Sequence, residues 1–451
     1  MNKFGRRLNK IIPGGAHTYS RGNDQFSSNT PDILVKGKGA YVWSADNTKF
    51  LDYGMGLRSI SIGYSEKKIN EEAYKAIKAG NNLTRPSLIE LEAAEMLNSL
   101  IGSSDMVKFA KNGSNVTSAA VKLARAYTGR DLVARCAQHP FFSFDDWFIG
   151  STEIPKGIPN QISKLTKEFN FNEIASLEKL IDKYPNKIAC VILEPATMEC
   201  PYTTNETEGC CGKKVCTRAN TRKNFLKDVE LLCKKHGIVF ILDETITGFR
   251  WSLGGAQKIF NVKPDLTTFG KAMANGFSVA AICGKKEIMQ LGSIERKNQE
   301  RVFLLSSTHG AEMSGLAAFI ATMEFMKKND VITHFWDYGS KLKEGFNNAS
   351  RRYGMIDCLY IDGPVVSPVI VTKDQLGKNS FELRTLFQQE MIKNGVLMPW
   401  IAISFRHKMP QLKFTISALE KSLEVCSKAI NSDISLYLEG PIIKPVFRKY
   451  N

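Results

Sequence analysis

The sequence lacks any long hydrophobic run. Across its 451 residues, no uninterrupted apolar segment approaches the roughly 18 residues that a membrane-spanning helix requires. The stretch 1–15 is basic and has no apolar core followed by a cleavage site, so nothing in it resembles an export signal. We therefore expect a cytoplasmic protein without a membrane partner.

Internal repeats and low-complexity linkers are also absent, and charge is not concentrated in blocks. The formal net charge is +16, which would suit a nucleic-acid-binding protein. However, the basic clusters at 213–223 and 444–451 are short, and aromatic residues do not interleave with them as in RNA-binding surfaces. A solvated lysine-rich surface is the favoured interpretation, and an anionic substrate would suit the same charge. Binding to nucleic acid is not expected and is kept as a lower alternative.

Ten cysteines in a long chain without an export signal favour reduced thiols over a disulfide framework. The exception is a group of four between Cys200 and Cys216, which includes the adjacent pair Cys210–Cys211. This spacing is not that of a zinc knuckle. A polar surface excursion is therefore expected there, with a metal site or disulfide as the alternative, and we expect no metal.

Short β-branched runs alternate with helical patterns through most of the chain. Short runs at 187–193, 237–242, 265–270 and 279–284 are mostly separated by segments with helical spacing. Such alternation predicts an α/β fold with a mainly parallel central sheet and helices on both of its faces. We expect a large domain over 66–315, and a smaller α+β domain built from both chain ends, 1–65 and 316–451. A hairpin is predicted around Ser44–Asn47 in the first of these ends.

Three of the predicted strands end in residues with reactive groups. The first runs into Glu194, the second into Asp243 and the third into Lys271, 28 residues after Asp243. Ligands of open parallel sheets bind beyond the carboxyl ends of the strands. A lysine there can form a Schiff base with an aldehyde cofactor and later move a proton. A carboxylate such as that of Asp243 can keep a pyridine nitrogen protonated, which makes the ring an electron sink.

A phosphate cradle is predicted before the amphipathic segment 116–129. Gly113, Ser114 and Asn115 lie in a turn between a strand pattern and this helix. Backbone N–H groups at a helix N-terminus, together with the helix dipole, stabilise a dianion. Combined with Asp243 and Lys271, this turn predicts a site for pyridoxal 5'-phosphate (PLP).

These motifs resemble the class III aminotransferases of the fold-type I PLP superfamily, and most closely the glutamate-1-semialdehyde aminomutase group. The resemblance covers about residues 11–405 and is carried by ILDETITGFR and by TTFGKAMANG. It implies that Lys271 forms the internal aldimine and that Asp243 contacts the pyridine nitrogen. It also implies that the turn at 113–115 binds the phosphate and that Glu194 lies beside the cofactor. Thr308 matches a threonine that reaches the phosphate of the neighbouring subunit, which implies a homodimer with shared active sites.

The substrate side departs from that group. Gln138 stands where an aromatic ring usually stacks on the cofactor, His139 is retained, and Phe141 is a candidate to replace the ring. Arg21 matches an arginine that binds the substrate carboxylate. Ser404, near the place of a glutamate, is another candidate for substrate binding. Arg58, beside Leu57 where the group has a tryptophan, and Arg406 are weaker candidates than Arg21.

Together these features predict a PLP-dependent aminotransferase that uses an amino donor and a carbonyl acceptor. Its acceptor is expected to be a sugar or sugar acid of surface-polysaccharide synthesis. An intramolecular aminomutase is the main alternative, and a racemase is a further one in the same class. A basic nucleic-acid-binding protein or a catalytically dead structural protein is the lower alternative.

Overall fold

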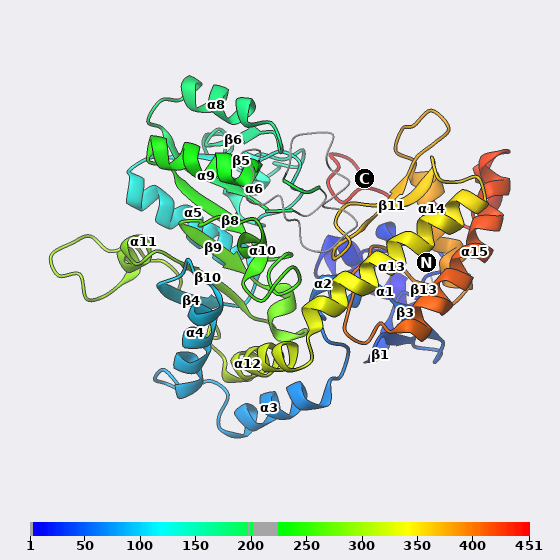
Figure 1. Cartoon of the computed structure of the whole chain (residues 1–451), viewed down its shortest axis with the longest axis horizontal. Helices are drawn as coiled ribbons and strands as arrows, with labels where there is room; N and C mark the ends of the chain where they lie inside the picture. Colours follow the sequence, from blue (N-terminus) through cyan, green and yellow to red (C-terminus); the bar gives the residue numbers. More distant parts are fainter. Residues whose placement is uncertain (1–2, 197–198, 202–223) are drawn as a thin grey trace. The chain divides into compact units, whose positions relative to one another are not determined.

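The computed structural model describes residues 3–196, 199–201 and 224–451. The chain forms two compact units (Figure 1). Unit 1 contains residues 1–58, 62–66 and 333–451, and unit 2 contains 59–61 and 67–332. The second boundary lies beyond the predicted 315/316 because α12 (Met313–Lys328) packs against α3 (Lys67–Lys78) and α4 (Leu88–Leu100) within unit 2.

Unit 2 is built on a seven-stranded sheet with the order β4-β10-β9-β8-β7-β5-β6. Strand β10 is antiparallel to both neighbours, whereas the other adjacent strands pair in parallel. The predicted mainly parallel sheet is therefore confirmed. The strands are β4 (Met106–Ala110), β5 (Leu132–Cys136), β6 (Thr166–Phe169), β7 (Ile188–Leu193), β8 (Val239–Asp243), β9 (Leu266–Phe269) and β10 (Ala280–Gly284).

Helices cover both faces of this sheet. The β4–β5 connection moves along the sheet in one direction, and the β6–β7 and β7–β8 connections move in the other. Because such crossovers are right-handed, α5 lies on the face opposite α8 and α9. The helices of unit 2 not yet placed are α5 (Gly113–Thr128), α6 (Asp146–Ile149), α7 (Asn160–Ser163), α8 (Ile174–Lys183), α9 (Phe225–His236), α10 (Gly255–Ile259) and α11 (Lys286–Met289).

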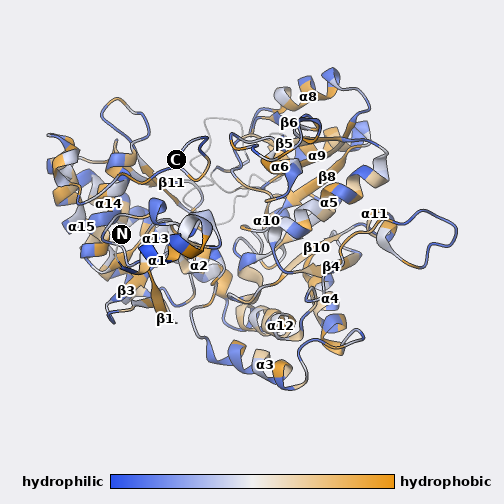
Figure 2. Cartoon of the chain, turned by 180° about the vertical axis from the view of Figure 1, so that it is seen from behind, coloured by the Kyte–Doolittle hydropathy of each residue, from blue (hydrophilic) through white to orange (hydrophobic). Residues whose placement is uncertain are grey.

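The core of unit 2 lies on the central strands. All residues of β7 and β8 are buried, and Figure 2 shows the hydrophobic colour on strands such as β8. Local signals fix the flanking helices. Asn112 caps the start of α5 through its side chain, and Gly129 ends the helix with a left-handed φ of 67°. Asn224 and Gly237 do the same for α9, as these residue types favour.

Unit 1 has a four-stranded sheet with the order β1-β2-β3-β13 and a β11–β12 ribbon. The β2–β3 pair forms the predicted hairpin, in which Asn47 has a φ of 66°. The strands are β1 (Leu34–Lys38), β2 (Tyr41–Ser44), β3 (Lys49–Asp52), β11 (Leu359–Asp362), β12 (Val369–Thr372) and β13 (Val396–Leu397). The helices are α1 (Lys3–Ile11), α2 (Met55–Arg58), α13 (Val331–Arg352), α14 (Phe381–Lys393) and α15 (Met409–Ile430).

The short element α2 is a left-handed turn. Met55, Gly56, Leu57 and Arg58 have φ values of 42°, 57°, 63° and 66°. Left-handed backbone costs about 1–2 kcal/mol per non-glycine residue, so surrounding contacts must hold this turn. The carboxylate of Asp52 accepts the N–H groups of Gly54 and Met55 at 2.7 and 3.1 Å.

In the part of the chain that the structure describes, no helix is both long enough and apolar enough to cross a bilayer. Cys210, Cys211 and Cys216 lie outside the described residues. Cys200 lies among the described residues, and its side chain is buried. Among the described residues, His, Cys, Asp and Glu side chains do not gather in groups of three or more that could hold a metal ion.

A buried carboxylate holds the connection between β8 and β9. Glu244 accepts the N–H groups of Ala256 and Gln257 at 2.7 and 2.8 Å and the hydroxyl of Thr247 at 2.7 Å. Burial raises the pKa of Glu244 from 4.5 to about 7. The folded chain therefore binds more protons than the unfolded chain between these two pH values.

We predict that the contribution of Glu244 to the free energy of unfolding falls by about 3 kcal/mol as the pH rises through this window. Glu244→Gln should lack this fall, which urea unfolding at about pH 4 and about pH 8 would measure. The same change at the exposed Glu287 is the control. Equal pH dependence in the wild type and the Glu244 variant would contradict the prediction.

Candidate functional site

Asp243 ends β8, near the centre of the sheet of unit 2. Its side chain is buried, and its carboxylate accepts the hydroxyl of Thr268 at 2.9 Å and the backbone N–H of Thr245 at 3.0 Å. Burial raises the pKa of Asp243, and the nearby ammonium of Lys271 partly opposes this effect. A carboxylate of raised basicity suits a partner that brings its own proton, such as a pyridinium nitrogen.

Parallel register brings the other predicted strand ends to the same edge. Asp243 pairs with Thr268 of β9, three residues before Lys271. On the other side of β8, Leu242 pairs with Leu193 of β7, which precedes Glu194. The structure thus brings Asp243, Lys271 and Glu194 together at one end of three neighbouring strands.

The backbone of Lys271 is in a rare conformation for a lysine, with a φ of 41°. Such a conformation costs on the order of 1–3 kcal/mol and persists where surrounding structure enforces it, often at functional sites. Here Lys271 opens a single 3-10 turn that ends at Asn275, itself left-handed with a φ of 45°. Asn275 is buried, and its side chain accepts the N–H of Ser61 at 3.1 Å.

The turn at 113–115 starts helix α5 as predicted, but only one of its three backbone N–H groups already donates to a side chain of the protein. The N–H of Asn115 donates to the side-chain oxygen of Asn112 at 3.0 Å. The N–H groups of Gly113 and Ser114 belong to the first helical turn, where the helix itself supplies no acceptor. These two N–H groups are the donors best placed for a phosphate. The side chain of Ser114 has a different role, because its hydroxyl oxygen accepts the N–H of Phe144 at 3.1 Å.

Thr245 connects these parts, and sequence reasoning missed it. A Cβ atom added to Gly113 would lie 3.1 Å from the Thr245 side chain, and one added to Gly270 would lie 3.2 Å from it. Thr245 therefore lies between the helix start, the strand end of Asp243 and the residue before Lys271. Its hydroxyl oxygen is buried and forms no hydrogen bond of standard geometry among the described residues, although it lies close enough to Asp243 to lower the pKa of that carboxyl. A buried polar atom with incomplete hydrogen bonding at this position fits a site that receives a polar cofactor.

His139 is buried at the end of β5, and burial lowers its pKa to about 3. The imidazole is therefore neutral, and its Nδ1 accepts the backbone N–H of Glu194 at 3.0 Å, which leaves the ring proton on Nε2. Its ring packs against the edges of Phe142 and Phe171. His139 thus links the ends of β5 and β7.

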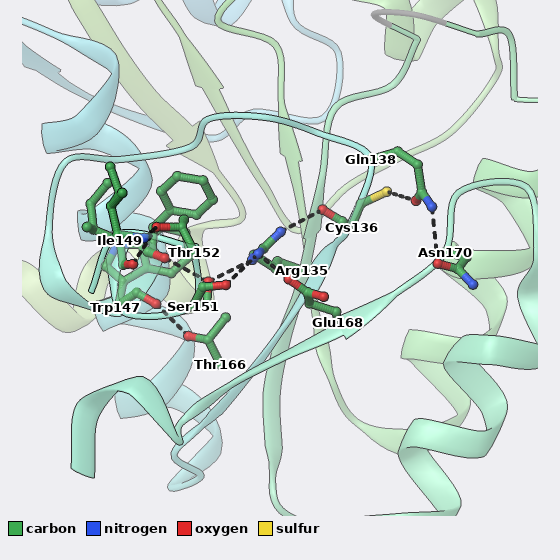
Figure 3. A network of polar contacts seen from close by, with 12 residues as sticks. Arg135, Cys136, Gln138, Trp147, Ile149, Ser151, Thr152, Thr166, Glu168 and Asn170 are labelled. Atoms are coloured by element: carbon green, nitrogen blue, oxygen red, sulfur yellow. Dashed lines mark hydrogen bonds and ion pairs between the residues drawn. The ribbon is translucent and has the colours of Figure 1, made fainter. Parts of the chain in front are cut away.

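Gln138, expected where a ring would stack, is exposed. Its amide nitrogen donates to Asn170 at 3.1 Å, and its oxygen accepts the N–H of Phe171 at 2.8 Å. Figure 3 shows this side chain pointing to Asn170; in the same view, the buried Arg135 forms an ion pair with the exposed Glu168. The ring of Phe141 is 45% exposed and lies edge-on to Phe148. Stacking on the cofactor by either residue stays a prediction.

Thr308 is exposed in unit 2, and its carbonyl accepts the side-chain amide of Asn82 at 3.1 Å. A contact of Thr308 with a neighbouring subunit stays a prediction. The remaining predicted residues lie in unit 1.

In unit 1, Arg21 is exposed and lines a cavity. Arg58 belongs to the left-handed turn and lies near Arg384, whose pKa is lowered to about 10 by burial and by Arg58. Ser404 is fully buried, with its hydroxyl 2.9 Å from Nδ1 of His407. Arg406 binds Glu66 in an ion pair at 2.6 Å, as its weaker candidacy implied.

Solved structures of transaminases have the same fold. The Sphingopyxis sp. MTA144 FumI protein, described in its PLP internal aldimine form, has a TM-score of 0.81 and 22% identity, with 95% of this chain and 97% of that chain covered. An omega-transaminase from Sphaerobacter thermophilus has a TM-score of 0.79 and 21% identity, with 94% and 97% covered. At this identity the likeness shows the fold, which is that of fold-type I PLP enzymes.

Sequence relatives cover almost the whole chain. A glutamate-1-semialdehyde 2,1-aminomutase from Francisella philomiragia subsp. philomiragia is 29% identical over 436 residues, which are 91% of this chain and 95% of the relative. A 3-aminobutyryl-CoA aminotransferase from Cloacimonas acidaminovorans is 29% identical over 431 residues, which are 93% and 96%. The sequence model of the aminotransferase class-III family matches residues 23–430. The chain therefore belongs to the class III aminotransferases, which are PLP-dependent enzymes.

Proposed function

We propose that this enzyme moves an amino group from a donor to a carbonyl acceptor, with PLP held at the carboxyl ends of β7, β8 and β9. The observation that carries the proposal is the position of buried Asp243, across the parallel register from the segment that leads to Lys271. When bound, PLP supplies the electron sink for bonds to the substrate amine carbon.

The residues of the chain divide the remaining work. Nζ of Lys271 holds the cofactor covalently and then carries the proton between the reacting carbons. The Asp243 carboxylate keeps a proton at the ring nitrogen, and the Thr268 hydroxyl holds that carboxylate in place. The N–H groups of Gly113 and Ser114 bind the phosphate at the start of α5. Thr308 reaches the same phosphate from a second subunit in a homodimer.

The acceptor is proposed to be a keto- or aldehydo-sugar, or a sugar acid, of surface-polysaccharide synthesis. The differences from the aminomutase group at Gln138, Leu57 and Ser404 support a substrate other than glutamate semialdehyde. The buried position of Ser404 supports the same view, because its hydroxyl is engaged with His407. An intramolecular aminomutase is the second candidate, favoured by the name of the Francisella relative.

Two measurements separate these candidates. With glutamate as donor, the aminotransferase should lose the visible absorbance of its bound cofactor and form 2-oxoglutarate, and a keto- or aldehydo-sugar should restore the absorbance. An aminomutase would convert glutamate semialdehyde to its isomer without net keto-acid release. If only a diamino acid or an amino-aldehyde is active, the sugar proposal fails.

Lys271→Ala should abolish the visible absorbance of the covalently held cofactor and all measurable turnover, because the variant lacks the amine that is proposed to form this bond. Absorption spectra before and after borohydride treatment would measure this loss. Lys286→Ala, at an exposed position in the same unit, is the matched control and should behave as the wild type. Normal turnover in the Lys271 variant would overturn the assignment.

Asp243→Asn should keep the fold and slow proton abstraction on the order of a hundredfold or more, because an amide cannot hold the ring nitrogen protonated. Cofactor should also be lost more readily on dialysis. Stopped-flow kinetics of the reaction with the donor would give the rate. The control is Asp265→Asn, at the residue just before the start of β9. A variant rate close to that of the wild type would exclude this role for Asp243.

A further inference from the structure

Lys111 is a charged side chain close to the turn at 113–115, and the proposed reaction does not use it. It directly follows β4 and precedes Asn112, the residue that caps α5. Because β10 is antiparallel to both β4 and β9, the latter two strands run in the same direction. Their carboxyl ends therefore lie at the same edge of the sheet. Lys111 is thus at the edge that carries Lys271.

The ammonium of Lys111 contacts two other segments of unit 2. It forms an ion pair with the carboxylate of Glu312 at 3.0 Å and donates to the backbone carbonyl of Ser278 at 3.1 Å. The hydroxyl of Ser278 in turn donates to the carbonyl of Lys111 at 2.6 Å. The side chains of Lys111 and Glu312 are only 19% and 28% exposed, so solvent and salt screen this ion pair less than a fully exposed one.

Ser278 lies between the 3-10 turn that starts at Lys271 and strand β10. The first residue of β10, Ala280, pairs with the last residue of β4, Ala110. The two hydrogen bonds between Lys111 and Ser278 continue this pairing beyond the strands. The end of β4 is thereby joined to the segment that follows Lys271.

Glu312 belongs to the segment that carries Thr308. Its carboxylate also accepts the hydroxyl of Ser314 at 2.8 Å, in the first turn of α12. Burial alone would raise the pKa of Glu312, but the Ser314 hydroxyl and the Lys111 ammonium lower this pKa below its usual value of 4.5. Glu312 therefore faces Lys111 as a charged carboxylate at neutral pH.

Hydrogen bonds hold the main chain around Glu312 in place. The N–H groups of Met313 and Ser314 donate to the carbonyl and to the side-chain oxygen of Asn81, at 2.7 and 3.0 Å. Glu312 itself occupies the N-cap position of α12. The ion pair with Lys111 therefore joins the end of β4 to a fixed support.

The ion pair also compensates charge beside the turn at 113–115. Without the ammonium of Lys111, the carboxylate of Glu312 would be partly buried and would lack its ion-pair partner, which is unfavourable. Its negative charge would also oppose a phosphate dianion at the nearby N-terminus of α5. Lys111 therefore acts on the turn in two ways, one geometric and one electrostatic.

We propose that Lys111 is a positioning residue for the cofactor phosphate. By joining the turn at 113–115 to the segment after Lys271, it fixes the N–H groups of the turn relative to the lysine that holds the cofactor. By pairing with Glu312, it compensates a negative charge that would oppose the phosphate. The inference rests on the proposed function, because it requires PLP at this edge of the sheet.

The full-length chain, freed of cofactor, would be titrated with PLP and with pyridoxal, which lacks the phosphate, and binding followed by visible absorbance. We expect Lys111→Met to weaken PLP binding about tenfold and to change pyridoxal binding less than about twofold. Lys111→Arg keeps the charge and should recover most of the affinity for PLP. The matched control is Lys108→Met, at an exposed residue of β4, which should bind both compounds as the wild type does.

A double variant tests the electrostatic part. Glu312→Gln, introduced into the Lys111→Met chain, should restore part of the affinity for PLP, because the uncompensated carboxylate is then absent. No recovery in the double variant would contradict this part of the proposal. Urea unfolding of each variant without cofactor would show that the differences in PLP binding do not follow from a loss of folded protein.

The proposal is overturned if Lys111→Met binds PLP as tightly as the wild type. It is also overturned if the variant weakens PLP and pyridoxal equally, because the effect would then not concern the phosphate. If the wild type binds PLP and reacts with glutamate in either case, the positioning role fails and the aminotransferase proposal stands. A wild-type chain that binds PLP with the expected dependence on Lys111 but transfers no amino group would reject the aminotransferase proposal alone.

Discussion

The site depends on the burial of one carboxylate at the end of a central parallel strand. Asp243 ends β8, a strand that is buried along its whole length, so its side chain is removed from water. Burial of a charge is costly unless other groups compensate for it. The hydroxyl of Thr268 and the N–H of Thr245 do so in part, and a protonated ring nitrogen would complete the set. The buried carboxylate of Asp243 would therefore be stabilised by a cationic partner.

The parallel sheet converts this local property into a site. Because β7, β8 and β9 run in the same direction, the residues after each strand meet at one edge. Glu194, Asp243 and Lys271 are far apart in the sequence and come together for this reason. Helix α5 adds its N-terminus, and Thr245 lies against the glycines at 113 and 270. Lys271 has a strained backbone because it lies at the start of a tight turn at this edge of the sheet.

Strand and helix patterns predicted much of this arrangement. Apolar runs ending in Glu194, Asp243 and Lys271 indicated the edge, and the turn at 112–115 indicated the helix start. Thr245 and Thr268 could not be predicted, because the register of neighbouring strands depends on tertiary packing that periodicity does not encode. The partners of Gln138 and Ser404 escaped prediction for the same reason, since Asn170 and His407 meet them only in the folded chain. The second unit boundary also differed, because α12 packs within unit 2.

The attachment of the cofactor to Lys271, which we propose, can be tested directly. The most direct measurement is to reduce the holoenzyme with borohydride, digest it and locate the pyridoxyl group by mass spectrometry. We expect a single modified peptide, with the group on Nζ of Lys271. A pyridoxyl group on a different lysine, or spread over many surface lysines without enrichment at Lys271, would contradict it.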